Sequence, residues 1–250
     1  MDPLTALSGN WRSAPVFAAL AAFALSAPVA ASAQDWATTA VPTDGGFRIG
    51  NPDAPVRLTS FLSYTCPACG AFSREAEGTL ALVYVGGGHL QVEHRSMVRD
   101  PVDLTVTMLV RCTPPRRMAA AHAMFLERQA GWLARAQSVP QAQQAVWTDA
   151  FTSAERRRSI ASTLGLHAMV ERFGVNRIAA DRCLSDNREA AALVRAAEGN
   201  RNRFGVTSTP SFAIDGTPLA GTHDWAMLQP QLDARIAASP RRTANPAAQR

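Results

Sequence analysis

The stretch V-R-L-T-S-F-L-S-Y-T-C-P-A-C, from Val56 to Cys69, carries most of the information about the fold. Its first nine residues are rich in β-branched and aromatic side chains and follow a turn-like segment, which predicts a strand. Apolar residues then recur at three- to four-residue spacing from Phe72 to Val83 and stop at glycines 86–88, which predicts a helix. The two cysteines therefore lie at a junction between a strand and a helix.

Strand-like and helical segments alternate along the rest of the chain. A second strand fits Leu90 to Val98, whereas the sequence from Pro101 to Ala197 lacks strand-like alternation and predicts several helices. Residues 210–220 read as a β-hairpin on an Asp-Gly turn, and an amphipathic helix fits Trp225 to Ile236. The expected order is β, α, β, a helical block, β, β, α, which makes the chain an α/β protein.

The N-terminus predicts an export signal. A lone Arg12 precedes the apolar run Val16 to Leu25, and Ala31-Ser32-Ala33 offers small residues to a signal peptidase. Cleavage there would make Gln34 the first residue of a periplasmic protein. The run is shorter than the ~20 residues that span a bilayer, although an uncleaved tethering helix is the alternative.

Composition points to a packed globular protein. Apolar residues make up 47% of the chain and charged residues 18%. All 25 basic residues are arginine, and the net charge is +5. Acidic residues lie near the runs Arg116-Arg117 and Arg156-Arg157-Arg158, with no aromatic-rich module beside them, so we interpret the runs as solvated helix faces and expect no nucleic-acid partner.

The motif Cys66-Pro67-Ala68-Cys69 has the spacing of a redox-active dithiol. Cys66 is expected at the start of a helix, where unpaired N–H groups favour its thiolate and make it the attacking and leaving sulfur. Cys69, one turn later, would be the resolving partner. Half a zinc site has the same spacing, but Cys112 and Cys183 do not form a second pair of that kind.

No metal or other cofactor is predicted. The five histidines, His89, His94, His122, His167 and His223, do not cluster in the sequence, so each is interpreted as an ordinary surface or core residue. Copper would be the favoured ion if exported thiolates did bind one.

The remaining cysteines predict a structural disulfide between Cys112 and Cys183. Both lie beyond the redox motif, and an exported protein seldom leaves two thiols unpaired in an oxidising compartment. Two unpaired, buried cysteines that behave as small apolar side chains are the alternative.

A second motif, G-V-T-S-T-P-S-F-A-I-D-G, runs from Gly205 to Gly216. Together with T-C-P-A-C it resembles the DsbA-like family of bacterial thiol-disulfide oxidoreductases, over roughly 47–236. The resemblance implies a thioredoxin-like fold interrupted by an inserted helical domain. It also implies that Cys66 is the exchanging nucleophile and that the bond between Thr209 and Pro210 is cis and faces the disulfide. The main chain of Thr209 would then be offered to an extended substrate segment.

The signal, the helical block and the tail read from the residues, together with the resemblance, divide the chain into five expected parts. These are a signal peptide (1–33), the first part of a thioredoxin-like domain (34–100), a helical insertion (101–197), the second part of that domain (198–238) and a disordered tail (239–250).

Two features depart from the family pattern. Strongly oxidising members carry histidine where Ala68 follows Pro67, so a thiolate-stabilising group is missing here. The buried acidic residue that assists proton transfer in relatives has no secure match, because Glu75 is only a nearby helical candidate and such a glutamate is usually exposed.

The expected function is that of an oxidase that donates the Cys66–Cys69 disulfide to unfolded or partly folded exported proteins. A membrane redox partner would reoxidise it. The alternatives are a disulfide reductase or isomerase, and a non-catalytic protein that binds peptides or a metal. The reduction potential decides among the redox directions.

Overall fold

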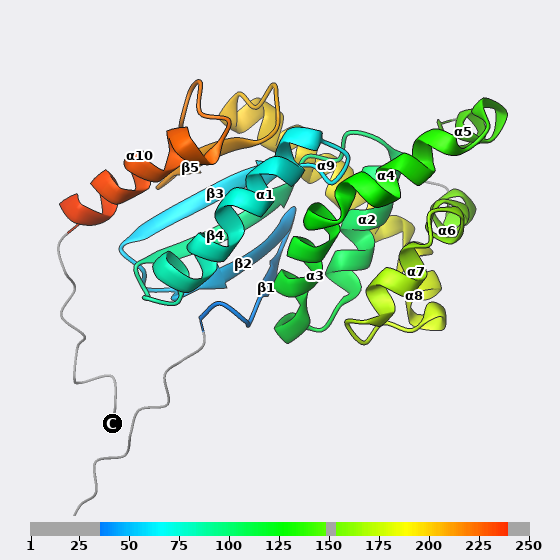
Figure 1. The fold of residues 1–250 in the computed structure, drawn as a ribbon, viewed down its shortest axis with the longest axis horizontal. Coiled ribbons are helices and arrows are strands. Elements are labelled where there is room, and N and C mark those ends of the chain that lie inside the picture. Colours follow the sequence, from blue (N-terminus) through cyan, green and yellow to red (C-terminus); the bar gives the residue numbers. More distant parts are fainter. Residues whose placement is uncertain (1–35, 149–153, 240–250) are drawn as a thin grey trace, which may run out of the picture. The chain divides into compact units, whose positions relative to one another are not determined.

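The computed structural model describes residues 36–148 and 154–239 (Figure 1). The predicted signal peptide, and all but the first residue of the predicted disordered tail, lie outside the described residues. Among the described helices, none is both long enough and apolar enough to cross a membrane.

Six strands form one mixed sheet in the order β1-β2-β4-β3-β5-β6. They are β1 (Val41–Thr43), β2 (Gly46–Gly50), β3 (Val56–Leu62), β4 (Leu90–Ser96), β5 (Ser211–Ile214) and β6 (Thr217–Pro218). The central strands β3 and β4 run parallel, with Val56 opposite Leu90, and every other neighbouring pair is antiparallel. The strand that leads into the cysteine motif, β3, is thus one of the two central strands of the sheet.

Helices occupy most of the remaining chain. They are α1 (Pro67–Thr79), α2 (Pro101–Cys112), α3 (Pro115–Glu127), α4 (Gln129–Ser138), α5 (Gln141–Thr148), α6 (Ala154–Thr163), α7 (Leu166–Glu171), α8 (Arg177–Leu184), α9 (Asn187–Phe204) and α10 (Trp225–Ala238). A π-helical stretch, η1 (Leu80–Val85), extends α1. Figure 1 shows α1 lying along the sheet beside α3 and α4.

The predicted core elements of the α/β fold are confirmed. Strands β3 and β4 each end two residues earlier than predicted, at Leu62 and Ser96. The hairpin turns at Asp215-Gly216, where both residues have positive φ, 50° and 82°, as a type I′ turn requires. The Asp215 carboxylate also accepts a hydrogen bond from the main-chain N–H of Arg57, which fixes the turn against β3.

The hairpin of β1 and β2 was not predicted. Its turn is Asp44-Gly45, because Thr43 pairs with Gly46. In β2 the side chains of Phe47 and Ile49 are buried and that of Arg48 is exposed, which is the alternation of a strand with one face on the core. This hairpin adds two strands to the β4 edge of the sheet.

All the regular structure described between β4 and β5 is helical, as predicted. Helix α9 passes Ala197 and ends at Phe204, where Gly205 adopts the left-handed conformation with φ 64°. The structure joins Cys112 of α2 to Cys183 of α8 by a disulfide, with the Cα atoms 6.2 Å apart. Two helices that are distant in sequence are thereby linked covalently.

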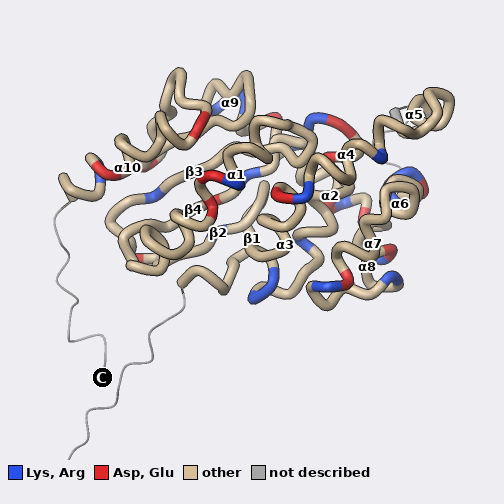
Figure 2. Tube along the Cα trace, viewed as in Figure 1, with Lys and Arg blue, Asp and Glu red and all other residues tan. Residues whose placement is uncertain are grey.

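One of the arginine runs does not form a solvated face. Arginine and acidic residues are interspersed along the described chain (Figure 2), but the Arg157 side chain is fully buried. Its guanidinium group donates to the main-chain oxygen of Leu184 and to Oδ1 of Asn187. The interpretation of this run as solvated was therefore wrong at Arg157, because these oxygens supply inside the protein the acceptors that water would otherwise offer.

Candidate active site

The end of β3 and the start of α1 place the two cysteines side by side. Cys66 is the N-cap residue of α1 and has extended backbone angles, and Pro67 occupies the first helical turn, where a missing N–H costs nothing. Both thiols are free. Cys69 is completely buried, whereas Pro67 and Ala68 are exposed between the two cysteines.

The thiolate form of Cys66 is strongly favoured. Its pKa is lowered to about 5, first because the Cys69 thiol donates a hydrogen bond to the Cys66 sulfur. The Thr209 hydroxyl and the main-chain N–H groups of Cys69 and Ala68 lower the pKa further, against the opposing effect of burial. These N–H groups belong to the first turn of α1, so the helix start supplies part of the stabilisation.

Cys69 behaves in the opposite way. Burial, and the hydrogen bond and charge of Cys66, raise its pKa far above the ordinary thiol value. The main-chain N–H of Ser63 points to its Sγ atom at 3.5 Å. Cys69 therefore keeps its proton while Cys66 is ionised, and the two sulfurs are chemically distinct.

The loop before β5 brings Thr209 and Pro210 to the first cysteine. The peptide bond between these two residues is cis. In its thiol form Cys66 donates to the main-chain oxygen of Thr209, over 3.1 Å. The buried Thr209 hydroxyl makes no hydrogen bond among the described residues, and it lowers the pKa of both cysteines, so it is available to donate to the Cys66 thiolate.

Sequence reasoning missed His223 at this site. Its Nδ1 lies 2.8 Å from the main-chain oxygen of Pro210, and because a carbonyl can only accept, the ring nitrogen is the donor. The histidine thus holds the proline loop from the side of α10. No local pattern marks it, since its partner is a main-chain atom thirteen residues away.

A buried carboxylate, Asp103, orders the loop that leads into the motif. It accepts hydrogen bonds from the Ser63 hydroxyl at 2.6 Å and from the main-chain N–H groups of Tyr64 and Arg99 at 2.8 and 2.9 Å. Burial, followed by the nearby Asp100, raises its pKa to about 6 despite these donors. Glu75, the acidic candidate considered from the sequence, is exposed on α1.

The helical segment contacts the motif directly through Gln129. Its side-chain amide donates to the main-chain oxygens of Tyr64 and Cys66, both at 2.8 Å. This approach depends on Gly70, because a Cβ atom there would lie 2.5 Å from Oε1 of Gln129. The first turn of α1 is therefore positioned by α4 as well as by β3.

A groove opens beside Thr209. It has a volume of about 440 Å³ and is lined by Met97, Arg99, Arg201 and residues 206–209. The groove therefore adjoins the loop that approaches Cys66, and two arginines give it a positive character.

Comparison with known proteins agrees with this architecture. A family model described as thioredoxin matches residues 42–234. A protein-disulfide isomerase from Novosphingobium aromaticivorans is 42% identical, with a TM-score of 0.74, over 78% of this chain and 99% of that one. A search of the curated proteins found no match.

More distant structures share the fold. Wolbachia pipientis alpha-DsbA1 is 17% identical, with a TM-score of 0.61, over 79% of this chain and 94% of that one. BdbD from Bacillus subtilis is 11% identical, with a TM-score of 0.54, over 80% and 96% of the two chains. The chain therefore belongs to the thioredoxin family; it is similar to a protein-disulfide isomerase and shares its fold with DsbA-like proteins.

Proposed function

We propose that the protein is an exported oxidase that transfers the Cys66–Cys69 disulfide to cysteine pairs of extracytoplasmic proteins. The observation that carries the proposal is the asymmetry of the two thiols. Cys66 has a pKa of about 5, whereas the pKa of the buried Cys69 is raised. A dithiol of this kind has one sulfur suited to exchange and one suited to closing the disulfide.

The reaction begins from the oxidised protein. A substrate thiolate attacks Sγ of Cys66, the Cys66–Cys69 bond breaks, and Cys69 leaves with the electron pair and takes up a proton. A mixed disulfide between the substrate and Cys66 results. Attack at Cys66 rather than Cys69 follows from burial, since Cys69 has no exposed surface.

The second step releases the product. A second substrate thiolate attacks the first substrate sulfur, the substrate disulfide forms, and Cys66 departs as a thiolate. A thiol of low pKa is a good leaving group. Because the low pKa also stabilises the reduced protein, it makes the protein a stronger oxidant and favours transfer to the substrate.

We propose that substrates bind in an extended conformation along the Thr209 loop and the adjoining groove. Thr209 supports this role because its main-chain oxygen already lies within hydrogen-bond distance of the Cys66 sulfur. Main-chain recognition is independent of the substrate's side chains, as in strand addition. Broad selectivity for unfolded or partly folded proteins would follow.

The cellular setting is part of the proposal. The sequence signal that ends at Ala33 would direct the chain to the periplasm, where a membrane redox partner would reoxidise it. Mass spectrometry of the protein from an envelope fraction should find Gln34 as the first residue. An intact Met1 in that fraction would contradict export by cleavage.

Disulfide isomerisation is the second candidate. It is favoured by the name of the 42% identical relative, a protein-disulfide isomerase. An isomerase must be reduced at rest, so that the Cys66 thiolate can attack incorrect substrate disulfides. A reductase would share that resting state.

The reduction potential of the Cys66–Cys69 couple tests the direction. Equilibration with glutathione buffers should place it above the ~−180 mV of protein disulfide isomerase but below the ~−120 mV of the strongest oxidants, because Ala68 stands where they carry histidine. A value close to thioredoxin would contradict the oxidase proposal. A value near ~−180 mV, that of protein disulfide isomerase, would favour the isomerase.

Turnover separates these enzymes from a non-catalytic binding protein. The first assay follows the oxidation of reduced ribonuclease by the oxidised protein, and the second follows the repair of scrambled ribonuclease by the reduced protein. Cys66→Ser is the control in both. The oxidase should accelerate only the first reaction, and Cys66→Ser should abolish the acceleration. Equal rates for wild type and Cys66→Ser in both assays would leave only a binding role.

A further inference from the structure

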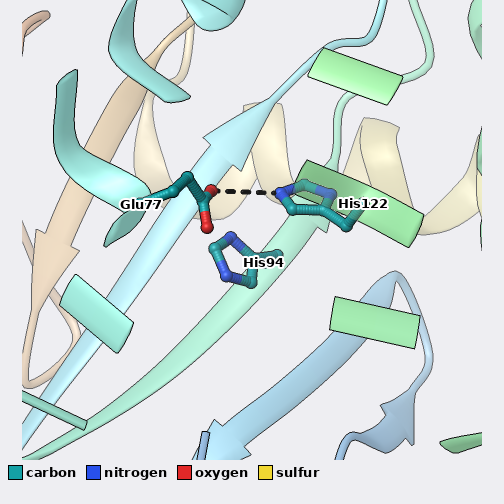
Figure 3. A group of neighbouring side chains, drawn as sticks. All are labelled: Glu77, His94 and His122. Atoms are coloured by element: carbon teal, nitrogen blue, oxygen red, sulfur yellow. Dashed lines mark ion pairs between the residues drawn. The ribbon is translucent and has the colours of Figure 1, made fainter. Parts of the chain in front are cut away.

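Three side chains from different elements converge behind the redox motif. Glu77 comes from α1, His94 from β4 and His122 from α3 (Figure 3). One potential ligand atom from each residue lies within 4.8 Å of the other two. Both histidines are buried, and the Glu77 side chain is 14% exposed. The cluster is absent from the sequence pattern because its members are separated by whole elements.

Two polar atoms of this cluster lack hydrogen-bond partners. Nε2 of His122 and Oε1 of Glu77 are buried and neither makes a hydrogen bond among the described residues; they lie 3.4 Å apart, an ion pair when His122 is protonated (Figure 3). Ligand atoms at ~2.1 Å from a tetrahedral zinc ion are themselves about 3.4 Å apart. The separation therefore suits two atoms that share a cation better than two that share a proton.

Hydroxyl groups hold the opposite nitrogens of both imidazoles. Nδ1 of His94 lies 2.9 Å from the Ser60 hydroxyl, and Nδ1 of His122 lies 2.6 Å from the Tyr64 hydroxyl. With the proton on Nδ1, each ring donates to its hydroxyl, and in His122 the lone pair of Nε2 then faces Glu77. Metal-ligating histidines are commonly oriented in this way.

A small cavity adjoins the two histidines of the cluster. It has a volume of about 20 Å³, the space of one water molecule, and is lined in part by Phe47, Tyr64, His94 and His122 but not by Glu77. The ring of Phe47 packs against both imidazoles, with centroid distances of 5.0 and 5.3 Å. The packing holds the rings in place and excludes a larger ligand.

Two arginines also line this cavity, but their charges are engaged elsewhere. Arg95 pairs with Glu93 and donates to Asn200. Arg111 pairs with Glu189 and donates to the main-chain oxygens of Thr43 and Gly46. Neither arginine therefore neutralises Glu77, whose ion-pair partner is His122 of the same cluster, so a bound cation would take the place of the His122 proton.

We propose that Glu77, His94 and His122 bind a divalent transition-metal cation of the zinc class, with a water molecule as the fourth ligand. Two imidazole nitrogens and one carboxylate form a donor set for zinc and its neighbours, whereas calcium and magnesium require oxygen ligands. The proposal departs from the absence of a metal expected from the sequence. The bound ion would tie α1, which begins with the redox motif, to β4 and α3.

The test uses mature, tag-free protein carrying Cys66→Ser and Cys69→Ser, so that the redox thiols cannot bind metal. After loading with zinc and dialysis, elemental analysis should find about one zinc ion per chain, the stoichiometry of a single three-residue site. Glu77→Gln in this background should remove the retained zinc. Tyr64→Phe, which removes only the hydroxyl beside His122, should weaken zinc affinity by ~10–100-fold in a chelator competition.

His167→Gln is the matched control, because His167 pairs with Asp181 at 2.8 Å outside the cluster. It should leave zinc affinity unchanged. The proposal is overturned if the double-serine protein retains no zinc, or if folded Glu77→Gln or Tyr64→Phe binds zinc as tightly as their parent. If Glu77→Gln fails to fold, the proposal is still tested by the zinc retained by the double-serine protein and by the zinc affinity of Tyr64→Phe. Because this zinc test uses protein without the redox cysteines, its outcome, whether zinc binds or not, leaves the oxidase proposal untouched.

Discussion

The Sγ atom of Cys66 lies 3.1 Å from the main-chain oxygen of Thr209, across 143 residues of sequence. The contact joins the start of α1 to the loop before β5. It also brings the Thr209 hydroxyl to the sulfur, where it lowers the pKa of Cys66. Reactivity at the first cysteine is therefore set partly by a residue from the other end of the domain.

Thr209→Val should raise the pKa of Cys66 and lower the reduction potential. The change preserves the shape of the side chain but removes the hydroxyl that donates to the thiolate. A lost hydrogen bond of about 1 kcal/mol corresponds to ~20 mV. Thiolate absorbance against pH and a glutathione titration measure both quantities. Thr207→Val, at an exposed position in the same loop, should change neither.

Ala68→His should have the opposite effect, lowering the pKa of Cys66 and raising the reduction potential together. The position is exposed beside Cys66, so an imidazole there can be accommodated and can stabilise the thiolate when protonated. The same two titrations apply. Ala68→Gln provides a control of similar polarity without a positive charge. A potential that moves equally in both variants would show that charge is not the cause.

The stability of the reduced protein should rise with pH relative to Cys66→Ser. The unfolded thiol has a pKa of about 8.5, and the folded value is about 5. A lowered folded pKa gives stability that is fully present above the unfolded value and is lost as the pH falls through the folded one. Urea unfolding at several pH values between these limits measures the difference. The oxidised protein, in which Cys66 cannot ionise, should show no such trend.

Asp103→Ala should destabilise the protein by about 1–3 kcal/mol, because buried donors are left without an acceptor. The donors are the Ser63 hydroxyl and the N–H groups of Tyr64 and Arg99. Urea unfolding measures the loss. Asp53→Ala, at an exposed turn position, should cost far less, and equal losses would contradict the role given to Asp103.

Removing the disulfide with Cys112→Ala and Cys183→Ala should lower the free energy of unfolding by about 2–4 kcal/mol. The bond closes a loop across a sequence separation of 71, and its loss frees the unfolded chain. Thermal or urea unfolding measures the change. A thiol titration of unfolded, unreduced Cys66→Ser/Cys69→Ser protein supplies the check: finding two free thiols would refute the bridge.

The central sheet and the redox junction could be predicted because their signals are local. The strand before Cys66, the helix after it and the Asp215-Gly216 turn each depend on residues adjacent in sequence. The same turn signal stood at Asp44-Gly45, where it was missed because the flanking strands are short and Pro42 interrupts one of them.

Other parts of the site could not be predicted because their contacts cross the fold. Asp103 receives hydrogen bonds from Ser63 and Tyr64 across about forty residues of sequence, and no spacing rule connects them. Glu77, His94 and His122 meet only after α1, β4 and α3 have packed. The sequence interpretation of Arg157 depended on its charged neighbours, but its partners are the last residue of α8 and the first residue of α9.

The close approach of Gly70 to Gln129 has an evolutionary consequence. Position 70 can accept a side chain only if position 129 becomes smaller or turns away, and the main-chain oxygens of Tyr64 and Cys66 would then lose their amide donor. The two positions cannot drift independently. A substitution at Gly70 would require both a permissive change at residue 129 and a small shift of the main-chain oxygen of Leu126, 3.2 Å from the added Cβ, so the order in which these changes arise would decide whether the lineage retains a working redox centre.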